Sequence, residues 1–329
     1  MVSVSVLSIL VLMFSSLFSS ASRAWITGTG NVERRRNVRA LTDYIGNELK
    51  AAMLPVQTFN VPTGGNQTTG NQTTGNLQFI VDPPTSQVGE AYQNSDSVFW
   101  QAPLATESTY GDIAEIGYFV KWLDVDKQQV NGTVIKDKVP MLCRFFINPS
   151  TTDPNGGGGL ILNPDYLIFD EQDPNKWLSD ALIAKVAPAD TDNGYKGLFC
   201  ENVVGLWIRC YGLDGQELPR NFDSRKGYQC KMQSTDAGGQ SADHVQNWTE
   251  TRYLPAKIVV SIAQVDSRYG PLVSNAATAL QSITGNSSIR DAAGFLQAFR
   301  QQALTTPVLK PLLPGLRIYS TEVLLTNAQ

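Results

Sequence analysis

The chain is poor in the residue types that most often carry catalysis or bind metal ions. It has one histidine and four cysteines in 329 residues. His244 stands in the polar stretch SADHVQNW, which we interpret as a surface loop. No two cysteines have the C-x-x-C spacing, and neither G-x-S-x-G nor H-E-x-x-H occurs. We therefore expect no catalytic residues, no metal site, no cofactor and no enzymatic activity.

Charge is also scarce, at 17% of residues with a net charge of −4 and no long basic run. We therefore expect no nucleic-acid binding. The stretch DPNGGGG at 153–159 lacks the Gly-Lys-Ser/Thr of a phosphate loop. Asp124 and Asp126 are spaced like the start of a calcium loop, but Ile135 stands where a bidentate glutamate is needed, so we favour a hairpin turn at Asn131-Gly132. A further acidic cluster in a Pro-containing loop is expected to be solvated: Asp170, Glu171 and Asp173.

The cysteines leave two interpretations open. Their even number is compatible with two disulfides in an oxidising compartment, with three possible connectivities. Free buried thiols that behave as small apolar residues are the alternative. The four positions are Cys143, Cys200, Cys210 and Cys230.

Abundant turn residues, 27 Gly and 17 Pro, favour an antiparallel β protein over a helix bundle. Runs rich in β-branched and aromatic residues predict the strands of its core. In the second of these runs, Ile116, Tyr118, Val120 and Trp122 alternate as on a half-buried strand. The predicted strands lie at 97–104, 115–126, 141–149, 202–215, 254–266 and 316–325.

A helical pattern interrupts this β-rich region at 270–303. Its clearest part is capped in our prediction by Ser288. The apolar stripe of that part is predicted to comprise Ile289, Ala293, Leu296, Phe299 and Leu304. Strands 257–266 and 316–325 flank the pattern and are expected to pair antiparallel, which makes the helices an insertion.

The N-terminal segment carries no charged residue before Arg23. About 20 such residues are enough for a helix to cross roughly 30 Å of hydrocarbon. We interpret the segment as a membrane anchor. A signal peptide cleaved near Ala24 and a buried core helix are the alternatives. The anchor's apolar residues are Val6, Leu7, Ile9, Leu10, Val11, Leu12, Phe14, Leu17 and Phe18.

An amphipathic helical pattern follows the anchor and ends at Pro55. Its apolar residues recur at spacings of three and four, so this half of the helix should pack on the chain's own β domain. The stripe comprises Val38, Leu41, Ile45 and Leu49. We thus predict an α+β protein. Its parts are a helix at 1–55, a polar GNQTT-containing loop at 56–76, and a β-rich head at 77–329 that contains the helical insertion near 270–305.

This organisation resembles the type IV pilin and pseudopilin superfamily. The order of motifs is most similar to the J-type minor pseudopilins of type II secretion, and closer still to the cassette protein C subgroup of the Verrucomicrobia, which shares an ending like LRIYSTEVLL at 316–325. The residues that carry the resemblance are Tyr118, Leu142 to Arg144, Val203 to Tyr211, Trp248 and Leu254-Pro255.

The resemblance implies a structural subunit rather than an enzyme. Its helix would pack with other pilin-like subunits in the inner membrane as a single span, and its head would lie in the periplasm and contact partners or secreted cargo. Members of the family begin with a basic leader, Gly and Phe-Thr-Leu-x-Glu, which this sequence lacks, so we expect them to be encoded upstream. The alternatives are an enzyme released by signal cleavage and an anchored binding module unrelated to pili.

Overall fold

The computed structural model divides into two compact units, Met1–Ile45 and Gly46–Gln329. It describes residues 40–53, 58–60, 71–73, 78–84, 95–107, 109–130, 133–153, 159–166, 177–186, 198–224, 229–235, 241–247 and 254–325. The predicted membrane anchor lies outside these residues. Within them, no helix combines the length and the apolar composition that a membrane span needs.

Residues 40–50 are helical, as the amphipathic pattern predicts. In the first unit, Leu41 and Ile45 are buried, with 5% and 0% exposure. In the second unit, the helix continues through Leu49, which is fully buried, and ends in a turn where the Ala51 amide donates to the carbonyl of Glu48 over 3.1 Å.

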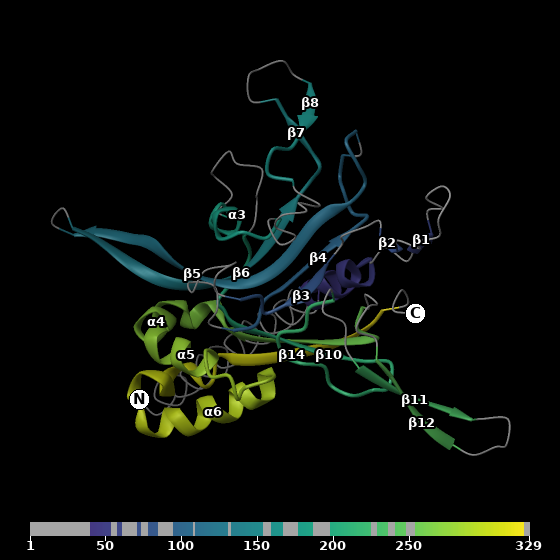
Figure 1. Ribbon diagram of the computed structural model, residues 1–329. Helices are drawn as coiled ribbons and strands as arrows, with labels where there is room; N and C mark the ends of the chain where they lie inside the picture. The colour runs from purple at the N-terminus through teal and green to yellow at the C-terminus, as the bar shows by residue number, and fades with distance from the viewer. Residues whose placement is uncertain are drawn as a thin grey trace, which may run out of the picture. The chain divides into compact units, whose positions relative to one another are not determined.

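The second unit is built on two antiparallel sheets (Figure 1). The larger has the order β3-β4-β5-β6-β9 and the smaller β10-β13-β14. The larger sheet comprises β3 (Phe79–Val81), β4 (Val98–Ala102), β5 (Ala114–Val130), β6 (Thr133–Ile147) and β9 (Leu198–Glu201). The smaller comprises β10 (Val203–Tyr211), β13 (Lys257–Val265) and β14 (Leu316–Leu324). All six predicted strand regions are therefore strands, but β6 begins eight residues before its predicted start, and β5 and β10 each end four residues away from their predicted ends.

Strand β5 differs from its prediction as a half-buried strand. Both faces are buried from Ala114 to Val120. One face carries Phe119, which packs in a cluster with residues of 177–186, including the short helix α3 (Asp180–Ala184). Gly117 makes room for this packing, because a Cβ there would lie 2.1 Å from the ring of Phe99. The predicted alternation of buried and exposed side chains is absent from this part of β5 because a segment distant in sequence covers the second face.

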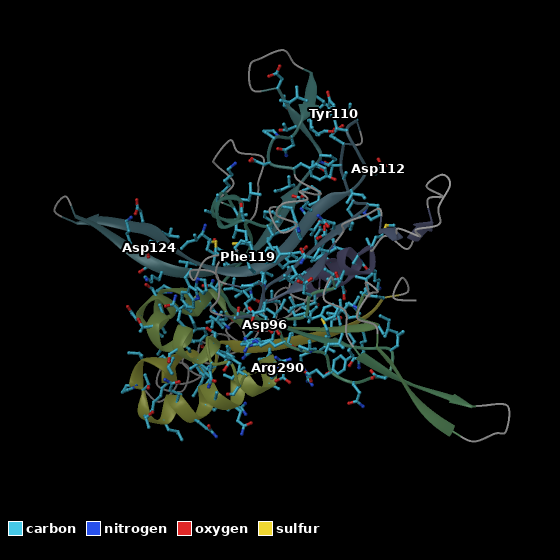
Figure 2. The ribbon with its side chains drawn as sticks, in the orientation of Figure 1. Asp96, Tyr110, Asp112, Phe119, Asp124 and Arg290 are labelled. Carbon is cyan, nitrogen blue, oxygen red and sulfur yellow. The ribbon has the colours of Figure 1, made fainter. Side chains whose placement is uncertain are left out.

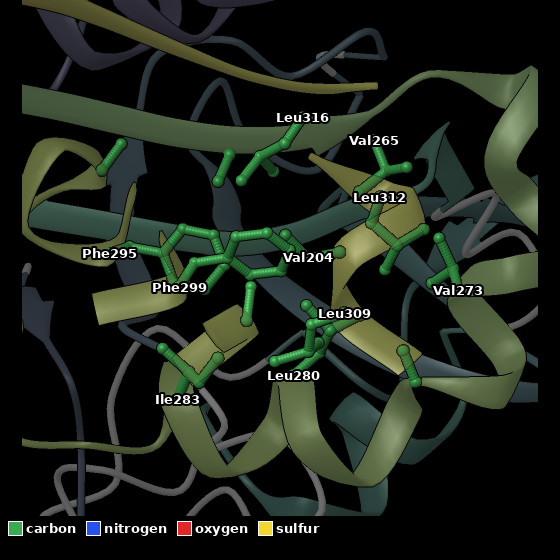
Figure 3. Close-up of a cluster of buried hydrophobic side chains, with 14 of the residues drawn as sticks. Val204, Val265, Val273, Leu280, Ile283, Phe295, Phe299, Leu309, Leu312 and Leu316 are labelled. Carbon is green, nitrogen blue, oxygen red and sulfur yellow. The ribbon is translucent and has the colours of Figure 1, made fainter. Parts of the chain in front are cut away.

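The predicted helical insertion consists of α4 (Gly270–Asn275), α5 (Ala277–Thr284), α6 (Ala292–Thr305) and the 3₁₀ helix η3 (Pro307–Leu312). It lies between β13 and β14, which pair antiparallel with Ile262 opposite Tyr319, so the predicted pairing is confirmed. A second apolar cluster joins these helices to the smaller sheet (Figure 3). At its centre the ring of Trp207 lies 5.2 Å from that of Phe295.

Helix α6 begins later than predicted. Its N-cap is Asp291, whose Oδ1 accepts a hydrogen bond of 2.7 Å from the amide of Gly294. Ser288 instead donates to Asn286 Oδ1 over 2.9 Å, so its predicted cap role is wrong. The apolar stripe also shifts, because the buried side chains are those of Ala292, Phe295, Phe299 and Ala303. Ile289 is buried, whereas the predicted Leu304 is 77% exposed.

Short two-stranded sheets complete the described structure. The region 56–76, predicted as a loop, contains the paired strands β1 (Thr58–Asn60) and β2 (Asn71–Thr73). Strand β7 (Ser150–Thr152) pairs with β8 (Leu160–Leu162). Strand β11 (Gln229–Thr235) pairs with β12 (Ser241–Asn247). His244 belongs to β12, so its assignment to a loop is wrong.

Candidate functional site

The most informative polar site of the described residues joins the helix to the larger sheet inside the second unit. Tyr118 of β5 and Arg144 of β6 are directly opposite each other in the strand register. Both side chains reach Glu48 on the helix. Arg144 donates from Nε over 3.1 Å and from Nη2 over 2.5 Å to the two carboxylate oxygens, and the Tyr118 hydroxyl donates to Oε2. We call these three residues the helix clamp.

The helix clamp is largely shielded from water. The side chains of Arg144 and Glu48 are 17% and 10% exposed. The guanidinium of Arg144 also lies 4.0 Å from the centre of the Phe146 ring, and the ring of Tyr118 stacks on Trp100 at 5.9 Å. A bidentate Arg–carboxylate pair in such surroundings fixes geometry as well as charge. The clamp is therefore suited to holding the end of the helix that belongs to the second unit in one position on the sheet.

A second polar cluster ties the two sheets of the unit together. The carboxylate of Asp96 is 1% exposed, and it accepts from Arg220 Nε over 2.8 Å and from the Ile208 amide over 3.0 Å. Asp82 lies 3.5 Å from the same arginine. Burial, and then the charge of Asp96, raise the pKa of Asp82 to about 6. Burial also raises the pKa of Asp96 and outweighs the effect of Arg220.

An adjoining network connects the helical insertion to the smaller sheet. Glu217 accepts from Arg209 over 2.5 Å and from Arg290 over 2.8 Å. Arg209 also lies 3.4 Å from Asp291, the cap of α6. The hydrogen bond from Arg209 lowers the pKa of Glu217. Partly exposed ion pairs such as these add little stability singly, but together they fix the start of α6.

The structure describes only some of the residues that we predict to take part in assembly. The apolar anchor residues from Val6 to Phe18, and Val38, lie outside the described residues. Leu41, Ile45 and Leu49 are buried. Packing of the anchor with other subunits stays a prediction.

The structure describes three of the four cysteine side chains, of which Cys143 and Cys210 are buried and Cys200 is partly exposed, and whether the chain forms disulfides stays a prediction. Cys143, Cys200 and Cys210 are free thiols. Burial raises the pKa of Cys143 to about 12 and that of Cys200 to about 11, and it raises the pKa of Cys210 too. At neutral pH these thiols are protonated and therefore weak nucleophiles. The side chain of Cys230 lies outside the described residues.

Of the acidic residues considered in the sequence, the structure describes Asp124 and Asp126. Asp124 and Asp126 are exposed on β5 (Asp124 is labelled in Figure 2), opposite Lys138 and Lys136 on β6. This arrangement is a cross-strand charge ladder. The cluster from Asp170 to Asp173 lies outside the described residues.

Sequence reasoning missed the role of Glu48. In the pattern it is one of several polar residues beside the apolar stripe. The available signal was indirect, because Tyr118 and Arg144 belong to the motifs that carry the pilin resemblance. Their shared partner becomes visible only when β5 and β6 are set in register.

Comparison with known proteins gives one structural match. No family model matches the chain, and no curated protein does. Among solved structures, the chain is similar to a type IV-like pilin from Thermus thermophilus, with 11% identity over 89% of this chain and 97% of that one. The TM-score is 0.30. At these values the similarity assigns neither a family nor a function to the chain. The structure itself shows an α+β protein with antiparallel sheets.

Proposed function

We propose that the chain is a pilin-like structural subunit, most similar in role to a minor pseudopilin of a type II secretion or type IV pilus-like assembly. Its N-terminal helix anchors it once in the inner membrane and packs with other pilin-like subunits. Its β-rich head lies in the periplasm and contacts partner subunits or cargo. No catalytic step, cofactor or nucleic acid belongs to this proposal.

The helix clamp is the observation that supports the proposal most. Tyr118 and Arg144 come from two of the motifs on which the pilin resemblance rests, and they meet at Glu48 of the predicted helix. A subunit that assembles through its helix needs a head held rigidly on that helix. A buried, bidentate ion pair supplies such a connection, since its geometry tolerates little rotation.

The composition of the anchor fits helix packing within a membrane. Several serines are interspersed among its apolar residues, and their hydroxyls can bond helix carbonyls or a neighbouring helix. Small and hydroxyl-bearing residues permit close approach of helices in lipid, where the hydrophobic effect does not drive their association.

The proposal is tested by fractionation of the protein expressed from its own gene, with whatever coding sequence precedes Met1 intact. The wild type is expected in the membrane pellet after alkaline carbonate extraction. Leu10→Arg should move much of it to the supernatant, because a charge at mid-bilayer costs about 2.5–3.5 kcal/mol. Leu213→Arg is the matched control, since this side chain is 41% exposed on the head, and it should leave the distribution unchanged.

Two results would overturn the proposal. A soluble protein whose mass begins after Ala24 would show signal cleavage and favour the secreted-enzyme alternative. Membrane retention without any complex containing other pilin-like chains, tested by affinity purification from detergent, would favour the unrelated binding module.

A further inference from the structure

An exposed apolar patch with acidic neighbours lies on the β7–β8 hairpin. Leu160 and Leu162 of β8 are 36% and 55% exposed, and Tyr110 beside them is 47% exposed. The Tyr110 hydroxyl donates to the Leu160 carbonyl over 3.2 Å, which places the ring against this strand (Figure 2). Glu107 and Asp112 are exposed on the same segment as Tyr110. We call these five residues the acidic patch.

A second exposed apolar patch lies at the end of α6 and on η3. Leu304 is 77% exposed, the highest value among the large apolar side chains described, and Val308 and Leu313 are 45% and 37% exposed. Their neighbours Leu309 and Leu312 are fully buried, so the segment turns alternate side chains toward the core and toward water. The exposed charges here are those of Arg300 and Lys310. We call Leu304, Val308, Leu313 and these two cations the basic patch.

The charges around the two patches are segregated by sign over long stretches of sequence. The segments 98–120 and 145–175, which contain the acidic patch, have no Lys or Arg. The segment 292–321, which contains the basic patch, has no Asp or Glu. Single exposed apolar residues are ordinary on a protein surface, whereas apolar groups collected with charge of one sign indicate a contact surface.

From this complementarity we propose that the acidic patch of one copy of the chain binds the basic patch of a second copy. Contact between the two different patches brings apolar groups together at the centre and opposite charges at the rim. Contact of either patch with its own equivalent would bring like charges together. Of the two, contact between different patches is therefore the favoured arrangement.

Such a contact is heterologous and leaves one patch free on each outer copy. In Figure 1 the β7–β8 hairpin and α6 lie on different sides of the second unit, so both patches can be occupied at once. Heterologous contacts that do not close into a ring produce open chains of subunits. This inference goes beyond the proposed function, because it concerns the head alone and does not depend on the membrane anchor.

Site-specific cross-linking of the full chain in detergent tests the proposal. Leu162→Cys and Leu304→Cys place thiols at the most exposed apolar position of each patch, and a short bis-maleimide joins thiols that meet. The double variant should give a ladder of dimers and larger species, and a mixture of the two single variants should give the cross-linked dimer. Each single variant alone should show only the background of the wild type, which keeps its own four cysteines.

Charge reversal in the double-cysteine background provides an independent arm. Asp112→Lys or Lys310→Glu alone should reduce cross-linking several-fold, because each opposes like charges across the contact. The two reversals combined in one chain should restore it. Dimers formed by either single-cysteine variant alone would show a symmetric contact and overturn the proposal. So would the absence of cross-links in the double variant, or reversals that leave the yield unchanged; none of these results bears on membrane anchoring.

Discussion

Removal of Arg144 from the helix clamp is the most informative single perturbation of the structure. Arg144→Met keeps a long apolar stem beside Phe146 but removes the guanidinium. Glu48 is then left with the Tyr118 hydroxyl as its clamp partner, at a side chain that is only 10% exposed. The substitution should therefore destabilise the second unit by much more than the loss of a surface ion pair would.

The magnitude follows from burial. Breaking a fully buried ion pair by removing one partner costs about 3–5 kcal/mol, and the partial exposure of this pair lowers our expectation to about 2–4 kcal/mol. Tyr118→Phe removes one hydrogen bond to a charged group and should cost about 2 kcal/mol. Replacing Glu48 and Arg144 together by Met should cost less than the sum of the two single changes, because no buried charge is left unpaired.

Urea unfolding of the detergent-solubilised chain, followed by tryptophan fluorescence, measures these differences. Trp100 stacks on Tyr118 and lies close to the clamp. Lys257→Met is the matched control, because its pair with Glu322 spans 3.9 Å and the two side chains are 34% and 66% exposed. The control should cost about 0–1 kcal/mol. If Arg144→Met costs no more than the control, the clamp does not hold the helix and the reasoning is refuted.

Other predictions concern the ionisable cluster, the core and the cap of α6. Because the pKa of Asp82 is raised from 3.8 to about 6, its ionisation disfavours the folded state, so the unfolding free energy should fall as pH rises from about 4 to about 6. Asp82→Asn, which tolerates the backbone φ of 51°, should reduce that fall by about 1–2 kcal/mol in unfolding curves measured across this range; parallel curves would contradict it. Phe299→Ala should cost about 3–5 kcal/mol in urea unfolding, whereas Leu304→Ala should change stability by less than about 0.5 kcal/mol, and equal losses would contradict the observed stripe. Asp291→Ala should lower the melting midpoint and reduce the free energy of unfolding by about 1 kcal/mol. An equal reduction in Ser288→Ala would contradict the assignment of Asp291 as the N-cap of α6.

The positions of the main strands could be predicted because their signal is local. Runs such as EIGYFVKW and KIVVSIAQV favour strands through their own β-branched and aromatic side chains. The pairing of β13 with β14 around an insertion was predictable for the same reason, since both strands are clear and the pattern between them is helical.

The errors arose where distant contacts or competing local bonds decided the outcome. The second face of β5 is buried by residues 177–186, whose position the sequence pattern of β5 does not contain. Ser288 and Asp291 are both good N-caps, and the bond of Ser288 to Asn286 leaves Asp291 to cap α6. The clamp depends on the register in which β5 and β6 pair. This register shifts between Asp126 and Gln128, and the sequence carries no signal of that shift.

Site-specific photocross-linking from the anchor, in intact membranes, tests the central claim most directly. A photoreactive residue at Val11, within the predicted apolar helix, should join the chain to other short proteins that carry an apolar N-terminal helix, identified by mass spectrometry. The same residue at Leu213, which is 41% exposed on the head, serves as the control and should not give the same helix-to-helix products. Recovery of those partners from Val11 is the result that assembly through the anchor predicts. Cross-links from Val11 to lipid alone, with no pilin-like partner, would contradict it.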